Sequence, residues 1–218
     1  MEKQSYKAVY EGGEAEIVEK KSRFIAHVAP AKTEEEALEF IEKIKKQYWD
    51  ARHNCTAYCI GVKQPVLRCS DDGEPGGTAG KPILEVIQGE ELHNVVIVVT
   101  RYFGGTLLGT GGLIRAYTKS TQEGIRNSKI ITKKLGQKMQ IQCDYTMSGK
   151  IQYLISTEQI PLLGTDYTEV VDFELMIPVE QIERIKKQFI EVSSGKITII
   201  EKEKEFFAEI DGQVKILE

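Results

Sequence analysis

The chain has 218 residues, enough for one large domain or two medium-sized ones, and its 41% hydrophobic and 28% charged residues are ordinary proportions for a globular protein. Its longest strictly apolar run, Val95 to Val99, is too short to cross a bilayer, and the N-terminus shows no apolar signal segment, so we expect a cytoplasmic protein with reduced thiols and no membrane partner. Of the 29 basic and 33 acidic residues, 9 and 15 lie from residue 135 onward, which leaves a net charge of +2 before that point and −6 after it.

The first part of the chain alternates strand and helix signals. A strand is predicted over 16–29, and the next helix begins with a capping box of Thr33 and Glu36. The inward face of that helix consists of Leu38, Ile41, Ile44 and Tyr48. A strand is expected near 55–62, followed by a loop over 70–80 and a short helix with Pro82 in its first turn and Gly89 at its end.

A run of β-branched residues over 94–102 is typical of a central strand that is covered on both faces. It leads into a second glycine-rich loop, and we expect the helix after that loop to span about 112–127. This succession of strand, glycine loop and helix is the arrangement that commonly places backbone amides at a ligand.

From residue 133 the pattern changes. The polar stretch 133–138 (KKLGQK) predicts a linker, after which the strand and helix signals restart. The expected elements are a strand over 139–145, a helix over 148–158, strands within 167–177, a helix after Pro178 that closes at Gly195, and a strand over 196–201. The inward face of the last helix consists of Val179, Ile182, Ile185, Phe189 and Val192. We therefore expect an α+β protein with two domains, 1–134 and 135–218, the second with the order βαββαβ.

The segment 101–117 (RYFGGTLLGTGGLIRAY) carries the strongest functional signal. Its glycines expose backbone amides at the start of a helix, whose dipole favours an anion; they are Gly104, Gly105, Gly109, Gly111 and Gly112. Arg101 and Arg115 would hold a phosphate or carboxylate, and Thr106 and Thr110 would add hydroxyl donors. The alternative is that the glycines only permit tight packing of the strand against the helix.

The loop 70–82 (SDDGEPGGTAGKP) combines carboxylates with glycines and a cation. Its candidate residues are Asp71, Asp72, Gly73, Glu74 and Lys81. Paired carboxylates beside a cation could hold Mg²⁺ near a phosphate or act as acid and base. Because Asp, Gly and Pro are also the common turn residues, a solvated turn is the alternative.

The known catalytic and cofactor motifs do not match. A dinucleotide fingerprint starting at Gly109 would need glycine or alanine where Ile114 stands, and a Walker A motif ending at Lys81 would need a hydroxyl where Pro82 stands. On a strand, His53 and Cys59 would lie about 20 Å apart, too far to share a metal. We expect no catalytic set, no cofactor and no metal. We also expect buried structural cysteines, namely Cys55, Cys59, Cys69 and Cys143.

Both loops closely resemble the signature of the IMPACT family, and so do the segments 21–26 (KSRFIA) and 51–55 (ARHNC). The resemblance covers roughly residues 15–130, and the rest of the chain resembles the ferredoxin-like extension of the bacterial branch. It implies an N-terminal β-α sandwich similar to a domain of a small-subunit ribosomal protein and to the fourth domain of elongation factor G. The second domain would then be similar to that factor's fifth domain.

This pair of domains implies that the partner is the ribosome, RNA or a translation factor. Eukaryotic members modulate translation by competing for the activator of a starvation-sensing initiation-factor kinase, which connects the family to stress responses. Those members carry an additional N-terminal recruitment domain. What the resemblance transfers to this chain is therefore the surface formed by the two loops.

Two functions follow from these signals. The first is a translation-associated regulatory binding protein whose glycine-loop face contacts the ribosome, RNA or a ribosome-bound factor through phosphates. The alternative is an enzyme that acts on a phosphorylated small molecule, with Asp71 and Asp72 holding a metal. The oligomeric state is not indicated by the sequence.

Overall fold

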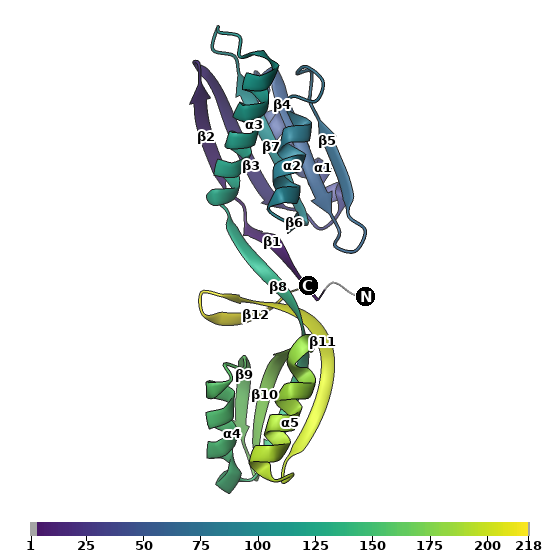
Figure 1. Ribbon diagram of the computed structural model, residues 1–218, viewed down its shortest axis with the longest axis vertical. Helices are drawn as coiled ribbons and strands as arrows, with labels where there is room; N and C mark the ends of the chain where they lie inside the picture. Colours follow the sequence, from purple (N-terminus) through teal and green to yellow (C-terminus); the bar gives the residue numbers. More distant parts are fainter. Residues whose placement is uncertain (1–3, 218) are drawn as a thin grey trace. The chain divides into compact units, whose positions relative to one another are not determined.

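The structure is a computed structural model that describes residues 4–217, and it divides into two compact units, the first ending at Ile131 and the second beginning at Thr132. The fold is mixed α+β, as predicted, with two sheets and five α-helices within the described residues. Figure 1 shows the course of the chain through both units. No helix between residues 4 and 217 is long and apolar enough to span a bilayer.

The first unit is built on a five-stranded antiparallel sheet. The strands lie in the order β2 (Glu14–Glu19), β3 (Ser22–Pro30), β7 (Val95–Tyr102), β4 (His53–Ile60) and β5 (Val66–Ser70). The predicted central strand is confirmed, because β7 lies in the middle of the sheet and every residue from Val95 to Arg101 is buried. A short parallel pair, β1 (Ser5–Glu11) and β6 (Leu92–His93), is also present.

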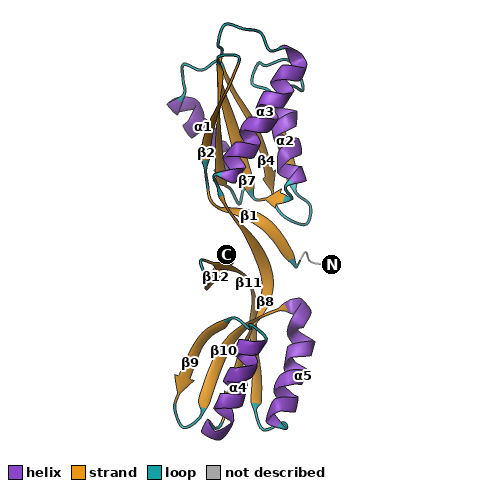
Figure 2. Ribbon diagram, turned by 60° about the vertical axis from the view of Figure 1, so that its left-hand side comes forward, coloured by secondary structure: helices purple, strands orange, loops and turns teal. Residues whose placement is uncertain are grey.

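Helices cover both faces of this sheet, as Figure 2 shows. One face packs against α1 (Glu34–Gln47), and the other packs against α2 (Gly80–Gly89) and α3 (Gly109–Arg126). The alternating side chains of β7 therefore serve two separate cores, with Ile97 on the α2 and α3 side and Val96 on the α1 side. This is the physical reason that the whole strand is apolar.

The single strand predicted over 16–29 is wrong, because the chain reverses there and forms the hairpin of β2 and β3. Lys20 and Lys21 make the turn with φ values of 46° and 67°, and Glu19 is paired with Ser22. Two-residue hairpin turns with positive φ at both positions usually contain Asn or Gly. Two lysines give no such signal, so the reversal was not visible in the pattern.

The capping box at the start of α1 is confirmed. The Thr33 hydroxyl accepts a hydrogen bond from the Glu36 amide at 3.2 Å, and the Glu36 carboxylate accepts one from the Lys32 amide at 2.6 Å. The prediction that Leu38 faces inward is wrong, because its side chain is 53% exposed while Ala37 is buried. The buried stripe runs through Ala37, Ile41 and Ile44, and Leu38 lies one position outside it.

The predicted linker over 133–138 is also wrong, because these residues lie within the long strand β8 (Lys129–Cys143). The strand begins in the first unit and continues into the second, where it is paired with a strand on each side. Gly136 stands where a Cβ atom would lie 2.6 Å from the Met176 sulfur and 2.7 Å from the Phe207 ring. It is therefore a packing glycine and not a sign of a flexible connection.

The second unit has the order β8, α4, β9, β10, α5, β11, β12, with a short 3-10 turn, η1 (Val179–Gln181), before α5. The remaining bounds are α4 (Tyr145–Thr157), β9 (Leu162–Tyr167), β10 (Val171–Pro178), α5 (Ile182–Ser193), β11 (Thr198–Ile210) and β12 (Gln213–Leu217). The sheet order in this unit is β12, β11, β8, β10, β9, and α4 and α5 pack on the core built around Phe173 and Phe189.

Three expectations for the second unit and for the thiols need correction. Val192 is 36% exposed and does not face inward. The buried stripe of α5 continues from Phe189 to Ser193, and Val192 lies one position outside it. The last predicted strand, 196–201, is longer than expected and extends to Ile210. Its pairing with β8 is interrupted after Glu201, where the side-chain amide of Gln137 donates to the Lys202 carbonyl. All four cysteines are free, as expected, but Cys69 on the edge strand β5 is exposed and not buried.

Candidate functional site

The two glycine-rich loops lie at the same end of the first unit's sheet. β5 and β7 are each antiparallel to β4, so both run in one direction and deliver their following loops to one edge. The turn at Lys20 and Lys21 lies there too, since a Cβ on Gly104 would come within 2.0 Å of the Lys21 backbone. The topology therefore brings together segments that are about 80 residues apart in the chain.

A buried polar network joins the two loops. Arg101 Nη1 donates to Glu74 Oε1 at 2.6 Å, and the Tyr117 hydroxyl donates to the same oxygen at 2.8 Å. The Cys55 sulfur lies 3.3 Å from the Tyr117 oxygen, and its thiol donates to the Asp71 carbonyl oxygen at 3.0 Å. Burial raises the pKa of both Tyr117 and Cys55, so both groups stay protonated and act as donors.

This network changes the roles expected for Arg101 and Glu74. Their side chains are only 8% and 3% exposed, so the guanidinium that was expected to hold an external anion already has a carboxylate partner. The Nε atom of Arg101 is buried and has no hydrogen-bond partner among the described residues. The pair links the two loops, and loss of either partner would leave the other as an uncompensated buried charge.

The two aspartates of the loop before α2 hold that loop together. Asp71 accepts hydrogen bonds from the amides of Gly77, Ala79 and Gly80 at 2.8, 3.0 and 2.8 Å. Burial raises the pKa of the Asp71 carboxyl, but the three amides outweigh it and leave the pKa below its usual value. Asp71 is therefore an ionised cap for the start of α2, where no side chain caps the helix locally.

Asp72 is also occupied. Its Oδ2 accepts a hydrogen bond from the Asn54 amide at 2.6 Å, and its Oδ1 lies 3.6 Å from Lys45 Nζ. Gly73 follows with φ of 85°, a conformation that favours glycine, and it packs against the ring of His53. No cluster of three metal-ligating side chains exists among residues 4–217. Both carboxylates that the enzyme alternative needs for a metal thus bind backbone amides.

The glycine loop itself is exposed. Gly105 and Gly109 adopt φ values of 84° and 69°, and Thr106 and Thr110 are both exposed. The helix begins at Gly109, earlier than predicted, so Gly111 and Gly112 lie inside α3. Glycine is a poor helix former, which explains the late predicted start, but the packing of Leu113, Ala116 and Tyr117 anchors the helix regardless.

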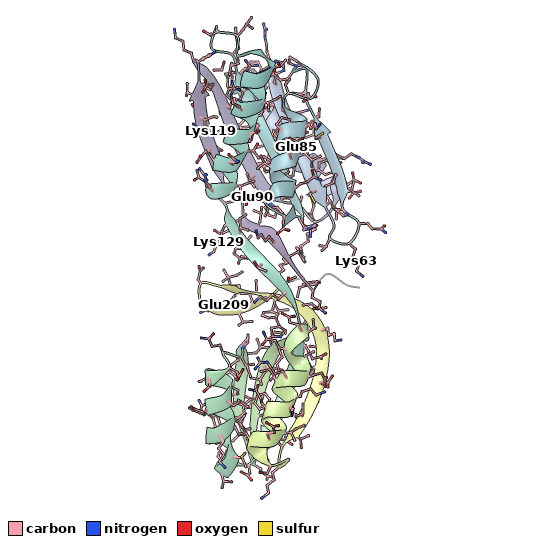
Figure 3. All side chains as sticks on the ribbon, viewed as in Figure 1. Lys63, Glu85, Glu90, Lys119, Lys129 and Glu209 are labelled. Atoms are coloured by element: carbon pink, nitrogen blue, oxygen red, sulfur yellow. The ribbon has the colours of Figure 1, made fainter. Side chains whose placement is uncertain are left out.

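The two predicted arginines do not converge. Arg115 is exposed on α3 and lies close to the first helical turn, since a Cβ on Gly111 would lie 3.6 Å from its Nη1. With Lys20 and Lys119 it lines a pocket of about 220 Å³, and Figure 3 marks Lys119 on α3 beside β2. Lys81 points elsewhere and lies 3.8 Å from Glu85 Oε1 on the outer side of α2.

A second pocket was missed in the sequence. It has a volume of about 600 Å³ and lies where β7 ends and β4 begins, with Arg52, His53, Phe103 and Leu107 in its wall beside Arg101. The His53 ring lies with Nδ1 2.9 Å from the Asp72 carbonyl oxygen. In the sequence, Arg52 and His53 stand out only as part of the family segment 51–55. The pattern of a strand does not indicate which loop will lie next to its first residues.

Comparison with known proteins gives two family matches in succession along the chain. Residues 20–125 match the Impact N-terminal domain, and residues 141–196 match a domain of unknown function, DUF1949. The two matches fall in the first and second structural units respectively.

Individual relatives support the same assignment. IMPACT family member YvyE of Bacillus subtilis is 44% identical over 211 residues, which is 97% of both chains. A solved structure described as a hypothetical protein is 31% identical with a TM-score of 0.59, covering 92% of this chain and 98% of that one. Protein IMPACT-A of Xenopus tropicalis is 36% identical over 98 residues, 43% of this chain and 30% of that protein. The chain therefore belongs to the IMPACT family.

Proposed function

We propose that this chain is a translation-associated regulatory protein that binds the ribosome, RNA or a ribosome-bound factor through the glycine-loop face of its first unit. Membership of the IMPACT family supports a role in translation. The observation that carries the proposal is that Lys20, Arg115 and Lys119 line one pocket along the first three turns of α3, with Glu19 as the acidic residue in the same wall. Backbone amides at a helix start and cationic side chains beside them form a receptive surface for phosphate.

The charge difference between the two parts favours the first unit over the second as the site for a polyanion. The residues up to 134 carry a net charge of +2 and those after it −6, so a polyanion is repelled less by the first part than by the second. We call the surface formed by Lys20, Arg115 and Lys119 the cationic patch. Arg126, further along α3, is paired with Glu123 at 2.6 Å and adds less to it.

We also propose that the two units correspond to the tandem of domains implied by the resemblance. The second unit supports a ferredoxin-like assignment through its βαββαβ order and through the strand order β11, β8, β10, β9, with β12 added at the edge. The first unit supports a β-α sandwich through its antiparallel sheet with helices on both faces.

The enzyme alternative has less support. It requires Asp71 and Asp72 to hold a metal beside a phosphorylated substrate, yet both carboxylates accept hydrogen bonds from backbone amides. Releasing them would remove the cap of α2 and the link to Asn54. We therefore prefer the binding function.

The proposal is tested by co-sedimentation with ribosomes across a salt series. The test variant is Arg115→Ala with Lys119→Ala, and the matched control is Lys43→Ala with Lys46→Ala, two exposed lysines of α1 on the opposite side of the sheet. Each removed phosphate contact should lower the slope of log K against log salt by roughly 0.7–0.9. The test variant should lose affinity and slope, while the control should behave as the unchanged protein. Equal behaviour of the two double variants, or no association at low salt, would exclude the proposal.

A further inference from the structure

The pocket beside Arg101 lies next to the cationic patch but is separate from it. Consecutive residues of the glycine loop divide the two sites, since Leu107 lines this pocket and Leu108 lines the pocket that holds the patch. Its volume of about 600 Å³ lies within the range of small-ligand sites. Phe103, Leu107 and Arg52 in its lining are not part of the two hydrophobic cores of the first unit.

One wall of this pocket is apolar and exposed. Phe103 is 53% exposed and Leu107 is 83% exposed, although both follow the fully covered strand β7. The other aromatic residues of the segment are occupied: Tyr117 is fully buried, and the Tyr102 hydroxyl donates to Asp50 Oδ1 at 2.7 Å. Phe103 is therefore the exposed aromatic ring of this segment, with the Arg101 guanidinium 5.8 Å from its centre.

The same pocket also contains charged and polar groups. Arg52 is exposed and has no ion-pair partner among residues 4–217. With Nδ1 donating to the Asp72 carbonyl oxygen at 2.9 Å, Nε2 of the His53 imidazole is a hydrogen-bond acceptor. Arg101 also lines the pocket, but its guanidinium is paired with Glu74. The acidic residue in the wall, Asp50, is held by the Tyr102 hydroxyl.

An exposed aromatic ring and an exposed guanidinium in one pocket match one kind of ligand, an aromatic base joined to a phosphate. We propose that this pocket binds one unpaired nucleotide, with the base stacked on Phe103, the phosphate contacting Arg52, and a ribose hydroxyl donating to His53 Nε2. The inference rests on the proposed function, which supplies RNA as the source of the nucleotide. Leu107 in this pocket and Leu108 in the pocket of the cationic patch are consecutive residues, so one strand could contact both sites.

The test is fluorescence anisotropy with a short single-stranded oligouridylate, a duplex of equal length, and the four nucleoside monophosphates as competitors. Phe103→Ala and Phe103→Leu should weaken single-strand binding by roughly 5- to 100-fold, because base–aromatic stacking is lost in both. Phe103→Tyr should retain binding. Arg52→Ala should weaken binding and lower its salt dependence. Circular dichroism and thermal unfolding establish that each variant is folded.

The leucine variant separates stacking from plain apolar contact. If Phe103→Leu binds as well as the unchanged protein, the ring is not a stacking platform and the inference fails; the apolar wall would then fit a protein partner. Direct binding of a monophosphate in isothermal titration calorimetry, abolished by Phe103→Ala and without oligonucleotide binding, would support the pocket with free nucleotide as the source.

Ribosome co-sedimentation of the same variants separates this inference from the proposed function. If the unchanged protein sediments with ribosomes in a patch-dependent way but binds neither oligouridylate nor monophosphates, the pocket inference alone is overturned. If it binds none of the three, both are overturned.

Discussion

Replacing Arg101 with alanine should destabilise the first unit strongly. The side chains of Arg101 and Glu74 are 8% and 3% exposed and meet at 2.6 Å. Removal of the guanidinium leaves the Glu74 carboxylate buried, with the Tyr117 hydroxyl as its remaining donor. Breaking one side of a buried ion pair typically costs about 3–5 kcal/mol, a large part of the roughly 5–15 kcal/mol by which a domain is stable.

A double variant shows whether the unpaired charge is the cause. Arg101→Met combined with Glu74→Gln removes both charges and keeps much of the buried volume, so its loss of stability should be clearly smaller than that of Arg101→Ala. The two Phe rings near the guanidinium, 5.4 and 5.8 Å from its central carbon, lose a cation–π contact in both variants and so do not account for the difference.

The assay is urea unfolding followed by circular dichroism and by labelling of the Cys59 thiol, which is buried in the first unit and becomes accessible when that unit unfolds. The free energy of unfolding of the first unit is compared among the three proteins. A cost below about 1 kcal/mol for Arg101→Ala would refute the reasoning, because that is the range of exposed ion pairs. An equal cost for the single and double variants would show that lost packing, and not the unpaired carboxylate, is responsible.

Three further predictions concern the same structure. Gly104→Ala should cost about 1–3 kcal/mol of stability because its Cβ would lie 2.0 Å from the Lys21 backbone, whereas Gly149→Ala, with open space around it in α4, should stabilise by about 0.5–1 kcal/mol; urea midpoints compare them. The folded pKa of Asp71 lies below its usual 3.8, so the contribution of its carboxylate to the free energy of unfolding is present above pH 3.8 and is lost as the pH falls through the lower folded value. Asp71→Asn should therefore be less stable at neutral pH and should lose less stability in acid than the unchanged protein. Equal declines of the urea midpoint with pH in the two proteins would contradict this. Ellman's reagent should label one thiol rapidly in the native protein, that of Cys69, and rapid labelling of a second would contradict the burial of Cys55, Cys59 and Cys143.

Local sequence signals were sufficient where the physics is local. The Thr33 capping box and the helix with Pro82 in its first turn depend on neighbours within a few residues. The apolar strand β7 is recognisable because burial affects nearly all of its residues. The hairpin at Lys20 and Lys21 was missed because its residues are unusual for the turn that they form. The pattern predicts a linker for residues 133–138 of β8 because these polar residues find their pairing partners in β10 and β11, far along the chain.

The candidate site shows the same division more sharply. The sequence by itself located both glycine loops, identified the family signature and predicted an anion-receptive helix start near Arg115. Only the tertiary structure decided that Arg101 and Glu74, 27 residues apart, pair with each other, and that Asp71 binds amides instead of a metal. It also decided that Phe103 is exposed while Tyr117 is buried, although both stand in one motif. The physical reason is that composition and spacing specify which charges and rings are available, whereas desolvation and contact geometry determine which of them are left free for a ligand.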